Sequence, residues 1–146
     1  MSKVVPFLNY AGQAAQAMDL YIKAFGARVK ERLTYADMNP ADAINEVKDE
    51  HKDFIGYSEL VIGGQIISLY DDNNAAENRV ENTGNAFTID LLVHFDSDEG
   101  LKTAYDALFD GATITTPLMT QTYCSLTCGL IDKFGGRWQL MSGYKG

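Results

Sequence analysis

The chain contains the same order of predicted elements twice, and this duplication restricts the fold more than any other feature of the sequence. In the first half, hydrophobic periodicity predicts a strand at 4–10 and then a helix that ends at Gly26. Alternating residues predict three more strands, at 29–35, 54–62 and 65–70. The last two of these strands are joined by Gly63-Gly64, a typical hairpin signal. A polar, acidic segment at 36–53 is expected to form a long loop or a short irregular helix.

The second half returns to this order after a polar connector at 71–85. A strand is predicted at 86–95, followed by a helix that Ser97 or Asp98 caps and Gly111 ends. Further strands are predicted at 112–119, 121–131 and 137–141. Two pairs of segments show the repeat most clearly, because 21–29 matches 105–114 and 62–69 matches 134–141. A repeat of this length is not a solenoid period.

The predicted fold class is therefore α+β, with two βαβββ modules at about 1–72 and 86–146 that form one domain over 1–146. A helix is expected on the outer side of each mixed sheet. The open sides of the two sheets would then face a shared concavity.

Composition narrows the possible partners. The chain has 146 residues, 46% of them hydrophobic and 22% charged, as expected for one globular domain. The formal net charge of -8 argues against nucleic acid or an anionic membrane as a partner, because phosphate binding needs an excess of cations. No apolar run reaches the roughly 18 residues of a membrane span, and no leader opens the chain, so we expect a cytoplasmic protein.

Cys124 and Cys128 are the only cysteines, and both lie in a predicted strand. Four strand residues span about 13 Å, whereas a disulfide tolerates roughly 7 Å between its Cα atoms. We therefore expect two buried, reduced thiols.

Several short motifs resemble one known family over about the full length of the chain. They are Pro6-Phe7-Leu8 before the first helix, Leu20-Tyr21 with Ala24-Phe25-Gly26, and Ile62-Gly63-Gly64 before an apolar strand. The most specific is 132–138, Asp-Lys-Phe-Gly-Gly-Arg-Trp. With these motifs the chain resembles the vicinal-oxygen-chelate (VOC) superfamily of glyoxalase I, bleomycin-resistance proteins and extradiol dioxygenases, and within it the PhnB-like branch. Relatives often carry a demethylubiquinone-methyltransferase-like label, but no Gly-rich nucleotide loop follows the first strand here.

The resemblance implies one divalent metal, held by side chains from the first and last strand of each module. The corresponding first-strand positions are Pro6 and Asp90, and the last-strand positions are Ile67 (or Ser68, with a slip of one residue) and Gln139. Pro and Ile cannot ligate through a side chain and Ser is a poor ligand, so the usual site looks dismantled. No cofactor is expected, although a divalent metal remains possible, with Asp90, His94 and Gln139 as weak candidates.

Strand alternation gives a separate prediction of the site. Ile89, Leu91, Val93 and Phe95 are predicted to face the helices, as are the apolar residues of the last two strands. The opposite face of the second module would carry the candidate ligand-binding residues, which are Asp90, His94, Tyr123, Ser125, Thr127, Arg137 and Gln139. Polar groups on a half-apolar surface suit a small-molecule site.

Structural explanations exist for the same residues. His94 could be hydrogen-bonded at a strand end, and Asp90 could accept hydrogen bonds from neighbouring strands. Arg137 could pair with Asp132 or Glu59 at a rim. Tyr123 stands where many PhnB-like relatives resemble one another in having Trp, and this resemblance implies an aromatic wall at that position.

Three functions therefore remain open. The first is a protein that binds a small molecule in a pocket and has a degenerate metal site. No reaction is assigned to it, and binding is favoured over catalysis. The second is a metal-dependent lyase, isomerase or dioxygenase that uses Asp90, His94 and Gln139, with Glu59 if it points inward. The third is a non-catalytic dimerisation module. A homodimer is expected from the resemblance in each case.

Overall fold

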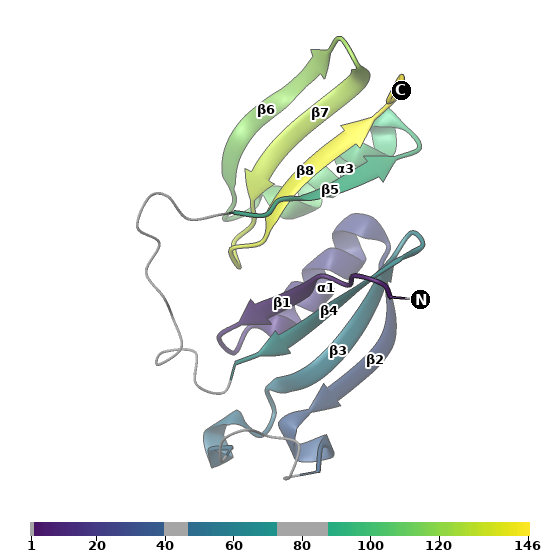
Figure 1. Cartoon of the computed structure of the whole chain (residues 1–146). Helices are drawn as coiled ribbons and strands as arrows, with labels where there is room; N and C mark the ends of the chain where they lie inside the picture. Colours follow the sequence, from purple (N-terminus) through teal and green to yellow (C-terminus); the bar gives the residue numbers. More distant parts are fainter. Residues whose placement is uncertain (1, 40–46, 73–87) are drawn as a thin grey trace. The chain divides into compact units, whose positions relative to one another are not determined.

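The computed structural model describes residues 2–39, 47–72 and 88–146, in two compact units that meet in sequence between Glu81 and Asn82. Each unit contains a four-stranded mixed sheet with an α-helix against one face (Figure 1). This is the predicted α+β class and the predicted pair of βαβββ modules.

The first unit has strands β1 (Phe7–Tyr10), β2 (Arg28–Thr34), β3 (Ile55–Ile62) and β4 (Gln65–Asp71), with helix α1 (Ala14–Phe25). The strand order in the sheet is β1-β4-β3-β2, with β1 parallel to β4 and the other pairs antiparallel. Part of the acidic segment forms two single turns of 3-10 helix, Tyr35–Asp37 and Asp49–His51, while residues 40–46 lie outside the described part.

Helix α1 follows from apolar residues at helical spacing. Its buried residues are Ala14, Ala17, Met18, Tyr21 and Ala24, which form one stripe against β3 and β4. The helix ends where predicted, because Gly26 adopts a left-handed conformation (φ 65°) and donates its N–H to the Ile22 carbonyl at 3.0 Å.

The start of α1 is fixed by a residue far away in the sequence. Gln13 provides no side-chain cap. The buried carboxylate of Asp71 accepts hydrogen bonds from the N–H groups of Gly12 at 2.8 Å and Ala14 at 2.9 Å, and its second oxygen accepts one from Ile55 at 2.9 Å. Asp71 at the end of β4 thus connects the start of the helix with the start of β3.

The second unit repeats the arrangement. It has strands β5 (Leu91–Phe95), β6 (Thr113–Gln121), β7 (Cys124–Ile131) and β8 (Arg137–Ser142), with helix α3 (Asp98–Phe109). The strand order is β5-β8-β7-β6, again with one parallel pair, β5 and β8. Ser97 caps the helix as predicted, and its hydroxyl accepts a hydrogen bond from the Gly100 N–H at 3.0 Å.

The core of the second unit lies between α3 and its sheet. Leu101, Ala104 and Leu108 of the helix are fully buried, as is Leu140 of β8. Trp138 is also buried, and its indole N–H donates to the carboxylate of Asp132 at 2.8 Å, so the largest core side chain keeps a partner for its polar atom.

Three predictions about the second unit were wrong. Strand β5 begins at Leu91, its first residue paired with β8, so Ile89 precedes the sheet and is 63% exposed rather than in the core. Gln121 belongs to β6, because it pairs with Cys124 across the turn that contains Tyr123. Phe109, predicted for the buried helix face, is 54% exposed at the end of α3. The connector predicted at 71–85 lies almost wholly outside the described residues.

The prediction for the cysteines is confirmed, since Cys124 and Cys128 are both unpaired and buried in β7. Burial raises the pKa of the Cys128 thiol to about 11.

Replacing Asp71 by Asn is expected to lower the free energy of unfolding by about 2–4 kcal/mol, because charge-assisted hydrogen bonds to buried N–H groups are lost. The side-chain oxygen of the substituted Asn can still accept a hydrogen bond, but its NH2 group would face a backbone N–H, which is also a donor. Urea unfolding followed by far-UV circular dichroism measures the change. Asp106→Asn, at an exposed position of α3, is the matched control. An equal effect of both substitutions would contradict the role of Asp71.

The thiol of Cys128 should react with iodoacetamide at pH 8 about 100-fold more slowly than an exposed cysteine of pKa near 9, because only about one thiol in a thousand is ionised. Mass spectrometry of the Cys124→Ala variant isolates this thiol. Reaction at the rate of a small model thiol would show that the site is open to solvent.

Candidate functional site on the second sheet

The register of β7 and β8 identifies the two faces of the second sheet. Cys128 pairs with Leu140 and Leu130 with Trp138, and these buried residues lie under α3. The alternate residues form the opposite surface, which we call the open face. It comprises Leu92 and His94 of β5, Arg137, Gln139 and Met141 of β8, and Thr127, Gly129 and Ile131 of β7.

A hydrogen-bonded cluster, the Asp90 cluster, lies at the β5 end of this face and consists of Asp90, Arg137 and Gln139. The Arg137 Nε–H donates to Oδ1 of Asp90 at 2.7 Å, and the Gln139 side-chain amide donates to Oδ2 at 3.0 Å. The side chains of Arg137 and Asp90 are 36% and 30% exposed, so the ion pair remains in contact with water. The cluster unites three of the seven predicted site residues.

Backbone pairing explains why the cluster forms. Strands β5 and β8 are parallel neighbours in which Leu92 pairs with Gln139, so Asp90, two residues before Leu92, lies on the same side as Gln139. Strand β7 is the other neighbour of β8, and its Gly129 pairs with Gln139. A Cβ atom at Gly129 would come within 2.8 Å of the Gln139 amide and 2.7 Å of the Thr115 hydroxyl, so glycine leaves the space that the Gln139 side chain occupies.

The cluster keeps Asp90 ionised. The hydrogen bond from Gln139, then that from Arg137, lowers the pKa of Asp90 below its ordinary value of 3.8, and partial burial opposes this only weakly. The negative charge is balanced by the adjacent guanidinium. Arg137 uses only Nε in this pair and makes no other hydrogen bond to the described residues, so its two NH2 groups are available to a ligand.

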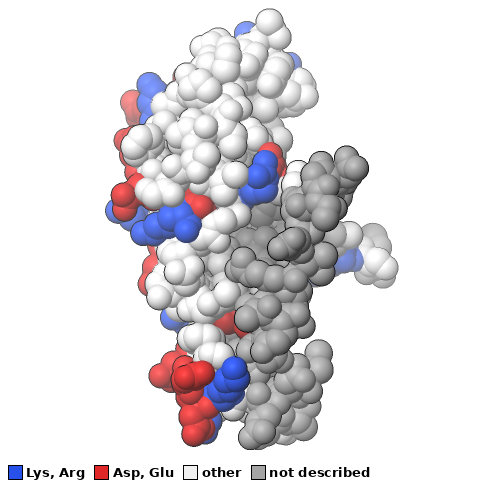
Figure 2. Space-filling model, turned by 90° about the vertical axis from the view of Figure 1, so that its left-hand side faces the viewer, with Lys and Arg blue, Asp and Glu red and all other residues white. Residues whose placement is uncertain are grey.

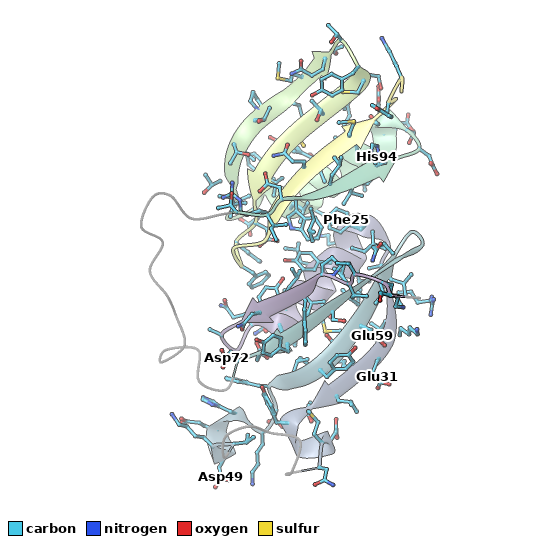
Figure 3. All side chains as sticks on the ribbon, viewed as in Figure 1. Phe25, Glu31, Asp49, Glu59, Asp72 and His94 are labelled. Atoms are coloured by element: carbon cyan, nitrogen blue, oxygen red, sulfur yellow. The ribbon has the colours of Figure 1, made fainter. Side chains whose placement is uncertain are left out.

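His94 and Thr127 also lie on the open face. His94 is exposed (Figure 3) and pairs with Met141. Its ring lies 5.6 Å from that of Tyr144. Thr127 is buried, and its hydroxyl donates to the Leu140 carbonyl at 2.8 Å, so that group is committed to the sheet.

Neither Ser125 nor Tyr123 belongs to the Asp90 cluster. The Ser125 hydroxyl lies 2.6 Å from the carboxylate of Asp98 in the first turn of α3, and Asp98 also binds the Ser142 hydroxyl at 2.5 Å. These bonds, that from Ser125 first, lower the pKa of Asp98. Tyr123 is 46% exposed in the turn before β7, where no strand alternation applies.

Arg137 does not pair with Asp132, because its Nε–H is bonded to Asp90. Asp132 instead accepts the N–H groups of Phe134 at 2.8 Å and Gly136 at 2.9 Å, besides the Trp138 indole.

The positions that the resemblance implies for a metal can now be read from the strand pairs. Ile67 is buried on the helix face and Ser68 lies on the opposite face, so the register with a slip of one residue applies. Across the parallel strands Phe7 pairs with Ser68, and Leu92 with Gln139, and neither Phe nor Leu can ligate. In the described part of the chain, no three His, Cys, Asp or Glu side chains are grouped to hold a metal ion.

The candidate ligand-binding residues named from the sequence include no aliphatic side chain, although the surface around them is partly apolar. Leu92 of the open face is 49% exposed, and Met119, which pairs with Thr127, is 38% exposed. Tyr144, next to His94, is 57% exposed. The strand periodicity contains a signal for Leu92, which is the one large apolar residue on the polar side of its strand. Tyr144 lies beyond the last strand, where strand periodicity gives no signal.

Comparison with known proteins defines the fold. No family model matches the sequence, and no curated protein matches it. Among solved structures, a protein from Pseudomonas aeruginosa is 21% identical with a TM-score of 0.77, and covers 97% of this chain and 98% of its own. A PhnB protein from Bacillus cereus is 23% identical with a TM-score of 0.72, covering 97% and 99%. A glyoxylase/bleomycin resistance protein/dioxygenase domain from Frankia sp. EAN1pec is 14% identical with a TM-score of 0.65, covering 100% and 95%.

The chain therefore has the VOC fold, and the PhnB protein is among the structures that share it. Of the helices that the structure describes, none is long and apolar enough to span a membrane.

Replacing Gln139 by Leu should raise the pKa of Asp90 toward 3.8, because the Gln139 amide makes the largest contribution to lowering it. The pKa of Asp90 is lower in the folded protein than in the unfolded chain. The cluster therefore stabilises the fold at pH values above the unfolded-state pKa, and this stabilisation is lost as the pH falls through the folded-state pKa. Titration of the Asp90 carboxyl carbon by NMR measures the shift. Gln65→Leu, at an exposed position of the first unit, is the control, and an unchanged Asp90 midpoint in Gln139→Leu would contradict the geometry.

Proposed function

We propose that this chain is a PhnB-like protein that binds a small organic molecule on the open face of the second sheet. The observation that carries the proposal is the Asp90 cluster, an ordered polar group on a sheet face whose helix packs on the other side. Binding sites of this kind combine a few placed polar groups with an apolar surround.

The apolar surround is supplied by the exposed side chain of Leu92 and the partly exposed side chain of Met141. Leu92 pairs with Gln139, and Met141 lies two residues further along β8. Part of the surface of the second unit carries few charged side chains in Figure 2. A partly apolar ligand would cover Leu92 and Met141 while its polar atoms contact the cluster.

The cluster favours ligands with oxygen acceptors. The NH2 groups of Arg137 can donate to a carboxylate, phosphate or carbonyl oxygen, and the Gln139 carbonyl can accept from a hydroxyl or amine. Asp90 keeps the guanidinium in place, because the Nε bond fixes the plane of the group.

We also propose that binding needs no resident metal, because the negative charge of Asp90 is already balanced by the Arg137 guanidinium at 2.7 Å. The metal-dependent alternative requires Asp90 to exchange Arg137 for an ion. Mass spectrometry after incubation with Mn, Fe, Ni and Zn and desalting tests this, and a stoichiometric ion that is lost in Asp90→Ala would replace our proposal by the alternative.

A homodimer remains part of the proposal. Light scattering measures it, and a dimer that binds no small molecule would favour the dimerisation module.

A thermal-shift screen of chemically diverse small molecules should yield ligands that raise the melting temperature and shift NMR signals of β5 and β8. Arg137→Gln should weaken their binding about 10- to 100-fold, as expected for loss of a charged hydrogen bond. Arg28→Gln, at an exposed position of the first unit, makes the same charge change and should have no effect. A screen without hits, or ligands indifferent to Arg137, would refute this function.

A further inference from the structure

The sheet face opposite α1 in the first unit carries a different chemistry. Residues there are identified by the strand pairs: Phe7 pairs with Ser68, Ser68 with Glu59, and Glu59 with Glu31, which places these four side chains in one row across all strands. The next row contains Tyr70 and Tyr57, which lie opposite each other beside the pair of Ser58 and Leu69.

Three aromatic rings pack together, one from the β1 end of this row and two from the next row. The ring of Phe7 lies 4.6 Å from that of Tyr70 and 5.9 Å from that of Tyr57, the second contact being edge-on at 85°. Phe7 is 54% exposed, so the group remains accessible at its β1 side. Aromatic faces attract cations through the negative potential above each ring.

Two carboxylates lie directly opposite each other next to these rings. Glu31 of β2 and Glu59 of β3 occupy adjacent strands (Figure 3), an arrangement of like charges that destabilises a sheet. In the described part of the chain, no Lys, Arg or His forms an ion pair with either residue. A positive ligand would remove this repulsion.

Ser68 adds a polar group to the same row. It is only 3% exposed, lies in the row between Phe7 and Glu59, and its hydroxyl makes no hydrogen bond to the described residues. No side-chain polar atom of the described residues is both fully buried and without a partner, so the Ser68 hydroxyl reaches the surface of this face, where a ligand can contact it. The neighbouring helix-face serine, Ser58, has a partner, because it donates to the Leu69 carbonyl at 2.8 Å.

We propose that this face binds an organic cation, an amine or quaternary ammonium group, with Phe7, Tyr57 and Tyr70 as the aromatic contacts and Glu59 as the counter-charge. The Ser68 hydroxyl accepts a hydrogen bond from the ligand or donates to its oxygen. This site lies in a different unit from the Asp90 cluster, so it goes beyond the function proposed above and does not depend on it.

Choline and its uncharged isostere 3,3-dimethylbutan-1-ol are suitable probes, because they have nearly the same shape. In NMR titrations of the full chain, choline should shift amide signals of β1, β3 and β4 saturably, and the isostere should bind at least about tenfold more weakly. Equal binding of the two would show that the face recognises shape rather than charge and would overturn the proposal.

Two variants locate the site. Glu59→Gln should weaken choline binding about tenfold and is expected to fold, since it removes one of two opposed carboxylates. Tyr70→Leu should weaken it similarly, whereas Tyr70→Phe should retain it. Glu99→Gln, exposed in α3, is the charge-matched control.

The proposal fails if Glu59→Gln leaves the choline affinity unchanged. It also fails if no signal of the first unit moves at roughly 100 mM choline, a concentration that would nearly saturate even a site with a Kd of about 10 mM. Such a failure leaves the Asp90 cluster untouched, because ligands of that cluster are detected through signals of β5 and β8.

Discussion

Each unit depends on a buried carboxylate that accepts hydrogen bonds from several backbone N–H groups. Placing a carboxylate in an apolar interior is costly unless hydrogen bonds satisfy its oxygens. Asp71 meets this condition with three N–H groups, from Gly12, Ala14 and Ile55, and thereby fixes the helix α1 against the sheet. Asp132 does so with the turn before β8 and with the indole of Trp138. Because Trp138 is held in this way, the residues on either side of it in β8, Arg137 and Gln139, are directed to the other face of the sheet.

Much of the fold could be predicted from the sequence, because local signals and hydrophobic periods agree in both modules. Gly26 and Ser97 mark helix ends in the sequence and do so in the structure. The errors fall at strand ends, where pairing decides the boundary and the pattern does not. Ile89 continues the alternation of β5 but has no partner in β8, and it is therefore exposed.

The candidate site was partly predictable for the same reason. Alternation placed Arg137, Gln139 and Thr127 on one face, and the register bears this out. Alternation does not tell which side chains bind each other, and Asp90 pairs with Arg137, which is 47 residues further along the sequence. Gly129 carries no side-chain signal, yet its missing Cβ makes the room for Gln139. Alternation likewise did not predict that the Ser125 hydroxyl donates to Asp98 at the start of α3.

The open face of the second sheet and the face opposite α1 on the first sheet differ in how their charges are balanced, and this difference decides what each can bind. On the second sheet the carboxylate of Asp90 already has a guanidinium partner, so the cluster carries no net charge and offers donors and acceptors of hydrogen bonds. A ligand there gains by adding contacts, since displacing Arg137 would leave a charge without its partner. On the first sheet Glu31 and Glu59 repel each other beside three aromatic rings. A cation there gains twice, from the rings and from the relief of that repulsion, and this is why the same fold can support two kinds of recognition in one chain.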